Sequence, residues 1–115
     1  MIARCWSARA TPARVPDYVE HVRTHVLAVV QAVPGYAGAL VLQRPDGPLV
    51  EILVMTWWTS LEAIRGFAGP DVEAAVVADA AVPLLAEYDQ RVRHFELVLS
   101  DEPAPGTGAP PPDRP

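Results

Sequence analysis

The spacing of apolar positions changes period once within residues 49–69, LVEILVMTWWTSLEAIRGFAG. The first ten of these residues are a run rich in Val, Ile, Leu, Met and Trp, which is typical of a strand buried over most of its surface. After Thr59 the apolar residues recur every three or four positions, which indicates a helix that Gly69 and the following proline end. Thr59 and Glu62 have the spacing of a capping box. The pattern predicts a strand, a tight turn and a short helix.

A longer helical pattern lies between residues 11 and 33. Its start is signalled at Thr11-Pro12 and again at Pro16-Asp17, because proline is accepted in a first helical turn, and the pattern does not choose between them. The apolar stripe of this helix consists of Tyr18, Val19, Val22, Val26, Val29, Val30 and Val33. So many β-branched residues are poor formers of an isolated helix, so this helix must gain its stability from packing.

Three further strands are predicted, at residues 1–7, 36–44 and 91–99. Gly38 inside the second of them suggests a bulge. The sequence PDGP at residues 45–48 predicts a turn, so this strand and the next form a hairpin. Two shorter helical pieces are expected near the end of the domain, one at residues 72–77 capped by Asp71 and one at residues 83–88.

The resulting order is β-α-β-β-α-β, which predicts the α+β class and a ferredoxin-like fold. In this fold a four-stranded antiparallel sheet carries its helices on one face. Leu53 and Met55 alternate with Ile52 and Val54, so both faces of the sheet are expected to be apolar. The simplest way to cover the second face is a second copy of the chain, which predicts a homodimer.

Composition sets the limits of the domain and of its partners. Residues 1–99 suffice for one domain, whereas residues 100–115 are rich in proline, lack large apolar side chains and are expected to form a disordered tail. A net charge of −5 argues against a nucleic-acid partner. The single cysteine rules out an intramolecular disulfide, and no apolar run is long enough to cross a membrane. We therefore expect a cytoplasmic protein without a membrane partner.

Histidines are the first candidates for chemistry. His21 and His25 are four residues apart beside Tyr18, a spacing that suits a pair of metal ligands, but no third ligand accompanies them and we expect no metal. His94 lies in the last predicted strand. Because an imidazole exchanges protons near neutral pH, His94 or His25 could deprotonate a phenol so that it reacts with oxygen. The alternative for His94 is a structural hydrogen bond to a strand neighbour.

Arg4 is the second candidate, because it shares a strand face with Trp6. A guanidinium group near aromatic rings can hold a phenolate or an enolate. The alternative is a cross-strand ion pair with Glu51 or Glu96.

Large aromatic side chains are expected mainly in the core or in a dimer interface. Trp6, Trp57 and Trp58 are three such side chains in a small domain, and at most one or two of them should line a ligand site. Cys5 is expected to be a small core residue.

Several of these segments resemble the antibiotic biosynthesis monooxygenase superfamily, whose members are dimeric α+β barrels. The matching segments are MIARCW at residues 1–6, the helix around Tyr18, PGYAG at 34–38, WWTSLEAIRGFAG at 57–69 and DQRVRHFEL at 89–97. The resemblance covers residues 1–99 and implies the same fold and a homodimer.

Members with known chemistry oxidise aromatic polyketides to quinones without flavin or metal, or degrade haem. Both groups carry a tryptophan at the position of Phe67 and an asparagine on an early strand, and this chain has no asparagine. The haem-degrading members add a histidine where this chain has Val76 and Val77, which disfavours haem degradation. The resemblance implies a cofactor-independent monooxygenase acting on a small aromatic or polyketide-like compound. The alternative is a non-catalytic small-molecule-binding or stress-related dimer on the same scaffold.

The candidate site combines both lines of reasoning. The expected catalytic residues are His94, His25 and Arg4. The expected substrate-binding residues are Tyr18, Trp6, Trp58, Phe67 and Ile64. No cofactor or metal is expected in this site.

Overall fold

The computed structural model describes residues 1–101, so the tail predicted for residues 100–115 lies almost wholly outside the described residues. The α+β class is confirmed. In chain order the elements are β1 (Ile2–Ala10), a 3-10 turn (Pro12–Arg14), α1 (Val15–His21), a π turn (Val22–Val26), α2 (Leu27–Gln31), β2 (Tyr36–Asp46), β3 (Leu49–Trp58), α3 (Leu61–Ala68), a second 3-10 turn (Val82–Leu84), β4 (Glu87–Tyr88) and β5 (Arg93–Glu96).

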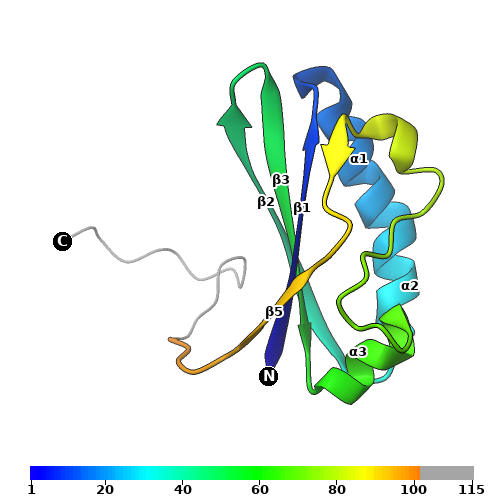
Figure 1. Cartoon of the computed structure of the whole chain (residues 1–115), viewed down its shortest axis with the longest axis vertical. Coiled ribbons are helices and arrows are strands. Elements are labelled where there is room, and N and C mark those ends of the chain that lie inside the picture. The colour runs from blue at the N-terminus through cyan, green and yellow to red at the C-terminus, as the bar shows by residue number, and fades with distance from the viewer. Residues whose placement is uncertain (102–115) are drawn as a thin grey trace.

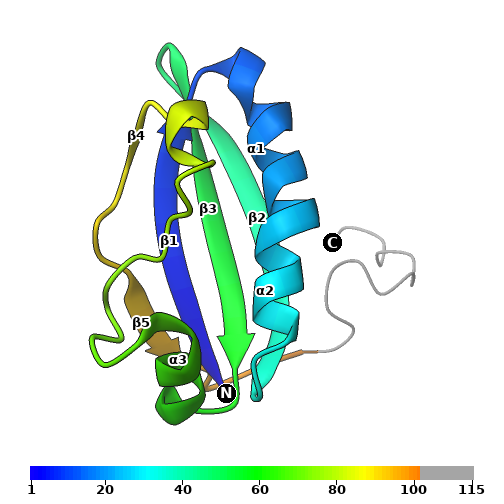
Figure 2. The same cartoon turned by 90° about the vertical axis from the view of Figure 1, so that its right-hand side faces the viewer.

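One antiparallel sheet runs in the order β2-β3-β1, and β4 and β5 both pair with the outer edge of β1. α1 and α2 run along one face of this sheet, and α3 lies on the same side (Figures 1 and 2). The predicted ferredoxin-like arrangement is therefore correct. The register between β2 and β3 shifts at Gly38, so the predicted bulge is also present. The φ of Gly38 is 145°, a value that favours glycine.

The 3-10 turn at 12–14, α1, the π turn and α2 follow one another as a single long helix. Both of its predicted start signals lie in its first turns. Thr11 precedes the 3-10 turn with its proline in the first turn, and the α-helix proper follows from Val15. In the middle, the amide of Leu27 donates to the carbonyl of Val22, five residues back, which makes one π turn. The helix axis therefore continues, but with one residue more in that turn than an α-helix has.

The start of α3 differs by one position from the prediction. Ser60, not Thr59, is the N-cap, and its Oγ accepts a hydrogen bond from the amide of Ala63 at 3.1 Å. The amide of Thr59 instead donates to the carbonyl of Gly35 at 2.9 Å. That bond joins the end of the long helix to the start of α3. Glu62 pairs with Arg65 rather than closing a capping box.

The helix predicted at residues 72–77 is wrong. Asp71 does accept a hydrogen bond from the amide of Glu73, but the chain then forms a loop with a single bridge between Ala74 and Arg91. Its backbone groups bond to distant parts of the chain, because the amide of Val92 donates to the carbonyl of Glu73 at 2.8 Å. A segment held by such long-range bonds has no need of helical ones.

Three other elements also differ in their bounds from the predicted ones. The helix expected at residues 83–88 is only the 3-10 turn at 82–84, and Glu87–Tyr88 pair with β1 as a strand. The last strand is shorter than the predicted 91–99, since β5 ends at Glu96 and the chain then leads away from the sheet (Figure 1). The first strand is longer than expected and reaches Ala10.

The core lies between the sheet and the helices in two clusters. One contains the buried residues Ala10, Val15, Tyr18, Val22, Ile52 and Ala81. The other contains Val30, Trp58 and Ile64, none of which is exposed. The candidate site lies in the space between these two clusters.

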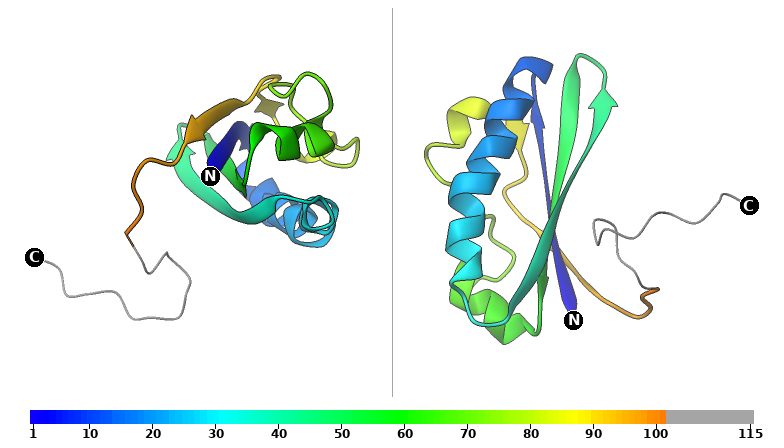
Figure 3. Two further views of the ribbon diagram at one scale, coloured as in Figure 1. Left: turned by 90° about the horizontal axis from the view of Figure 1, so that it is seen from below. Right: turned by 180° about the vertical axis from the view of Figure 1, so that it is seen from behind.

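The opposite sheet face carries no helix within residues 1–101, as Figure 3 shows from behind. One half of it is apolar and includes Cys5, Leu53, Met55 and Trp57. The other half is charged, with Arg9–Asp46 and Arg44–Glu51 ion pairs at 2.6 Å. The prediction that both sheet faces are apolar is therefore confirmed for only one half of this face. Cys5 is half-buried there rather than in the core.

Among the described residues, no helix is long and apolar enough to cross a membrane.

Candidate functional site

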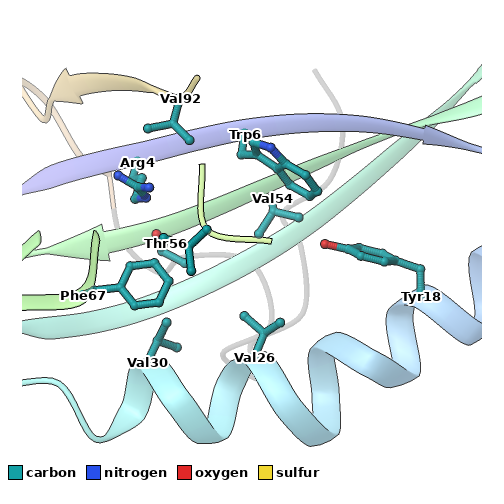
Figure 4. A pocket seen from close by; sticks show the side chains of 10 residues that line it. Arg4, Trp6, Tyr18, Val26, Val30, Val54, Thr56, Phe67 and Val92 are labelled. Atoms are coloured by element: carbon teal, nitrogen blue, oxygen red, sulfur yellow. The ribbon is translucent and has the colours of Figure 1, made fainter. Parts of the chain in front are cut away.

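A cavity of about 60 Å³ lies between the two core clusters (Figure 4). β1 and β3 form its floor, the long helix faces them, and α3 and the loop after it close one end. Its lining residues are Arg4, Trp6, Tyr18, Val26, Val30, Val54, Thr56, Phe67, Val76 and Val92. Most of the wall is therefore aliphatic or aromatic, with few polar groups.

Arg4 is the charged group of this cavity. Strand alternation on β1 points it toward the helices, where only 5% of its surface is exposed. Its guanidinium donates to the carbonyl of Val72 and, at 2.7 Å, to that of Ala74. Burial lowers the pKa of Arg4 to about 10, so it stays charged at neutral pH. No carboxylate within residues 1–101 forms an ion pair with it, so the alternative partners Glu51 and Glu96 are not used.

Thr56 and Tyr18 add two further hydrogen-bond donors. The hydroxyl oxygen of Thr56 accepts from Nε1 of Trp58 at 2.8 Å, which leaves its proton free to point elsewhere. The hydroxyl of Tyr18 points into the cavity (Figure 4), and burial raises its pKa to about 12, so it stays protonated. Each polar side chain on the cavity wall therefore carries at least one hydrogen-bond donor.

Phe67 fixes the aromatic side of the cavity beside Arg4. The central carbon of the guanidinium lies 5.6 Å from the Phe67 ring centroid, within the range of a cation–π contact. Phe67 in turn stacks on Trp58 at 5.7 Å with an interplanar angle of 21°. Trp58 meets Tyr36 edge to face at 5.5 Å. This row of rings holds Phe67 in place.

His94 lies behind Arg4 and not on the cavity wall. Its Nε2 is 3.2 Å from Nη1 of Arg4, its cross-strand neighbour. Because an arginine only donates hydrogen bonds, Nε2 must accept, so His94 is neutral and carries its proton on Nδ1. Burial first, and the charge of Arg4 second, lower the pKa of His94, against an opposing effect of Glu73.

His25 lies outside this cavity. It is exposed on the helix and borders a second hollow of about 120 Å³. Its ring stacks on that of His21 with centroids 5.1 Å apart. Within residues 1–101 no group of three His, Cys, Asp or Glu side chains is placed to hold a metal ion.

The expected substrate-binding residues divide into two groups. Tyr18, Trp6 and Phe67 line the cavity together with Arg4. Trp58 and Ile64 are fully buried in the core and reach the cavity only through their neighbours.

Six lining residues were not among the predicted site residues: Val26, Val30, Val54, Thr56, Val76 and Val92. Thr56 lies two positions before Trp58 on the same face of β3, so alternation alone would have placed it. Val76 belongs to the loop after α3, where no periodic pattern exists to reveal it.

The antiparallel sheet, covered by helices on one face and with a cavity beneath them, defines an α+β domain with a candidate ligand site. No protein-family model and no curated protein sequence matches the chain. Solved structures do match it, and they include a candidate antibiotic biosynthesis monooxygenase. The predicted resemblance to this superfamily is thereby confirmed as a resemblance in fold.

Among these structures are those of MhuD, a haem degrader from Mycobacterium tuberculosis. The structure with two haems bound in its active site is 27% identical, with a TM-score of 0.57 over 89% of this chain and 100% of that chain. A point mutant of MhuD with two manganese protoporphyrin IX molecules per active site is 26% identical, with a TM-score of 0.60 over 90% and 100%.

A candidate antibiotic biosynthesis monooxygenase from Bordetella bronchiseptica also matches. It is 20% identical, with a TM-score of 0.57 over 85% of this chain and 97% of that chain. At this identity the match describes the fold alone.

Proposed function

We propose that the cavity binds the oxyanion of a small hydroxylated aromatic or enolic compound and promotes its oxidation by molecular oxygen, without an organic cofactor or metal. The observation that carries this proposal is the donor set of the cavity. Arg4, Thr56 and Tyr18 bring groups with N–H and O–H donors to the wall of an apolar space that no carboxylate or imidazole of residues 1–101 lines. Such an arrangement stabilises negative charge on a bound oxygen atom.

The reaction follows from the charge that the cavity stabilises. Loss of the hydroxyl or enol proton raises electron density at the ring carbon, which then reacts with oxygen. One oxygen atom forms the new carbonyl group, and the other leaves as water with the two hydrogens lost from the substrate. The substrate supplies all of the electrons, so one oxygen molecule is consumed for each quinone formed.

His94 supports this chemistry by positioning Arg4. The lone pair on Nε2 of His94 already accepts a hydrogen bond from Arg4. His94 therefore has no unoccupied nitrogen that could take a proton from the substrate. We therefore assign it the role of orienting the guanidinium rather than that of a base. A substrate that is already ionised at neutral pH, or one that releases its proton to water at the cavity mouth, suits this wall best.

Oxygen uptake with a panel of anthrones and naphthols tests the proposal. The wild type should consume one oxygen molecule per quinone formed. Arg4→Gln should lower kcat/KM by about tenfold or more, since a hydrogen bond to a charged group contributes roughly 1.5–3 kcal/mol. Arg9→Gln, on the opposite sheet face, is the matched control and should keep full activity. No uptake above buffer by the wild type would sink the proposed reaction.

A non-catalytic binding protein is the second candidate. It is favoured by the side chains that line the cavity, because among the described residues none of them is a carboxylate or imidazole that could act as a general base. Binding of a naphtholate by calorimetry without oxygen uptake would support it. Haem belongs in the same panel because MhuD binds it, although the cavity as it stands is far smaller than a porphyrin.

We also propose that the open sheet face pairs with a second copy of the chain. Leu42 and Phe95 are each 49% exposed, and Val98 and Leu99 beyond β5 are 90% and 85% exposed. Together with the apolar half of the face, these side chains form a patch of the kind that marks a protein interface. A two-fold dimer through this patch would bury it on both copies.

A further inference from the structure

The second hollow borders the cavity on the side of the long helix. Its lining residues are His25, Val26, Val29, Phe67, Val76, Val77 and Ala78. Val26, Phe67 and Val76 also line the inner cavity. These three side chains therefore form a neck between the two spaces, and we call the second space the outer hollow.

The volumes show why the neck matters. The inner cavity of about 60 Å³ and the outer hollow of about 120 Å³ are each smaller than the roughly 150 Å³ of an apolar cavity that takes up benzene. Joined through the neck, they exceed that size. An aromatic ring bound near Arg4 must therefore occupy the neck as well.

Val76 is the part of the neck that can yield. It lies in a loop outside any helix or strand, and 52% of its surface is exposed. Phe67 is held by its stack on Trp58, and Val26 by the helix. A small displacement of the Val76 side chain opens the passage at little cost in packing.

The two ends of the joined space differ in polarity. The inner end carries the donors of Arg4, Thr56 and Tyr18, whereas His25 is the single polar side chain among the residues that line the outer hollow. A neutral imidazole both donates and accepts hydrogen bonds. We propose that cavity and outer hollow are one site for a flat, elongated ligand, with its anionic oxygen at Arg4, its rings in the neck and a second polar group at His25. The inner half of this assignment rests on the proposed function.

Calorimetry with two naphthoates tests the assignment without oxygen chemistry. The carboxylate of 2-naphthoate stands in for the substrate oxyanion, and 6-hydroxy-2-naphthoate adds a hydroxyl at the opposite end of the rings. The wild type should bind the hydroxylated compound about two- to tenfold more tightly, the gain expected of one hydrogen bond. His25→Phe should abolish that preference. Thr24→Phe, an exposed neighbour that lines neither space, should keep it.

The neck is tested separately by enlarging Val76. Val76→Trp should weaken binding of both naphthoates at least fivefold, whereas Val82→Trp, at another exposed valine outside the site, should not. Both positions are exposed, so both variants should fold, and circular dichroism checks this.

The outcomes separate this inference from the proposed function. If Arg4→Gln weakens 2-naphthoate binding but neither His25→Phe nor Val76→Trp changes any affinity, the joined site is wrong and the inner anion site stands. If Arg4→Gln has no effect on binding, the anion site itself is wrong. Failure of the wild type to bind either naphthoate at millimolar concentration would overturn both.

Discussion

Gly35 stands at the joint between the long helix and α3, and replacing it with alanine should be strongly destabilising. Its φ is +92°, which favours glycine. A Cβ atom there would lie 2.4 Å from Cβ of Ala63 and 2.8 Å from Oγ1 of Thr59. The Gly35 carbonyl also accepts the amide of Thr59, so the backbone has little freedom to move away.

The size of the effect follows from two costs. The left-handed conformation costs an alanine about 1–2 kcal/mol. Overpacking against a neighbouring helix costs about 1–3 kcal/mol more. The sum of about 2–5 kcal/mol should lower Tm by on the order of 10–30 °C in a domain of this size. Displacement of α3 should also move Phe67 away from Arg4 and weaken anion binding.

Thermal unfolding followed by circular dichroism measures this change. Gly47→Ala is the matched control, because Gly47 also has a positive φ, +59°, but nothing lies within 4 Å of its would-be Cβ. It should lose only the conformational part, about 1–2 kcal/mol. If Gly35→Ala and Gly47→Ala were equally stable, the close contact between Gly35 and α3 would not exist as described.

Three further predictions concern the dimer, the cap and the titration of the site. Leu53→Asp, on the apolar half of the open sheet face, should leave the fold intact and reduce the sedimenting mass to that of one 12.4 kDa chain, and an unchanged two-chain mass would contradict the proposed interface. Ser60→Ala should cost about 1 kcal/mol in urea unfolding and Thr59→Ala less, and the reverse order would restore Thr59 as the N-cap. Because burial and Arg4 hold the pKa of His94 below its ordinary 6.5, the unfolded chain binds the proton first, so stability should fall as the pH drops below about 6.5. His94→Gln should flatten that fall, and identical urea midpoints against pH for wild type and variant would refute it.

Local patterns were enough to predict the framework of the fold. The hairpin around Gly47, the bulge at Gly38 and the strand-turn-helix of residues 49–69 all follow from side-chain period and turn chemistry. Each of these features depends on residues close together in the sequence. The exact cap of α3 did not follow, because Thr59 and Ser60 are both acceptable caps and the contact with Gly35 decides between them.

The loop after α3 could not be predicted for a different reason. Residues 72–77 are valine, alanine and glutamate, a composition that is compatible with a helix. Their backbone groups bond to residues distant in the sequence: Arg4, 68 and 70 residues earlier, donates to the carbonyls of Val72 and Ala74, and the amide of Val92 donates to the carbonyl of Glu73. No local pattern carries that information.

Only the part of the candidate site that depends on local sequence periodicity could be predicted. Alternation places Arg4 and Trp6 on one face, and the helical stripe adds Tyr18. The position of His94 behind Arg4 depends on the pairing of β1 with β5, which the sequence does not state. The separation of His25 from the inner cavity depends on the neck, which includes a loop residue.

The π turn at residues 22–26 makes the length of the long helix as consequential as its composition. Each helical residue turns the chain by about 100°, so the added residue sets the rotational phase between the half that carries Tyr18 and the half that carries Val30. Deleting one residue there, such as the exposed Thr24, would restore a regular α-helix and rotate one half against the other. Either Tyr18 would leave the cavity or Val30 would leave its cluster with Trp58. Related chains should therefore keep the same residue count between those two positions, even where exposed residues of this turn such as Thr24 change.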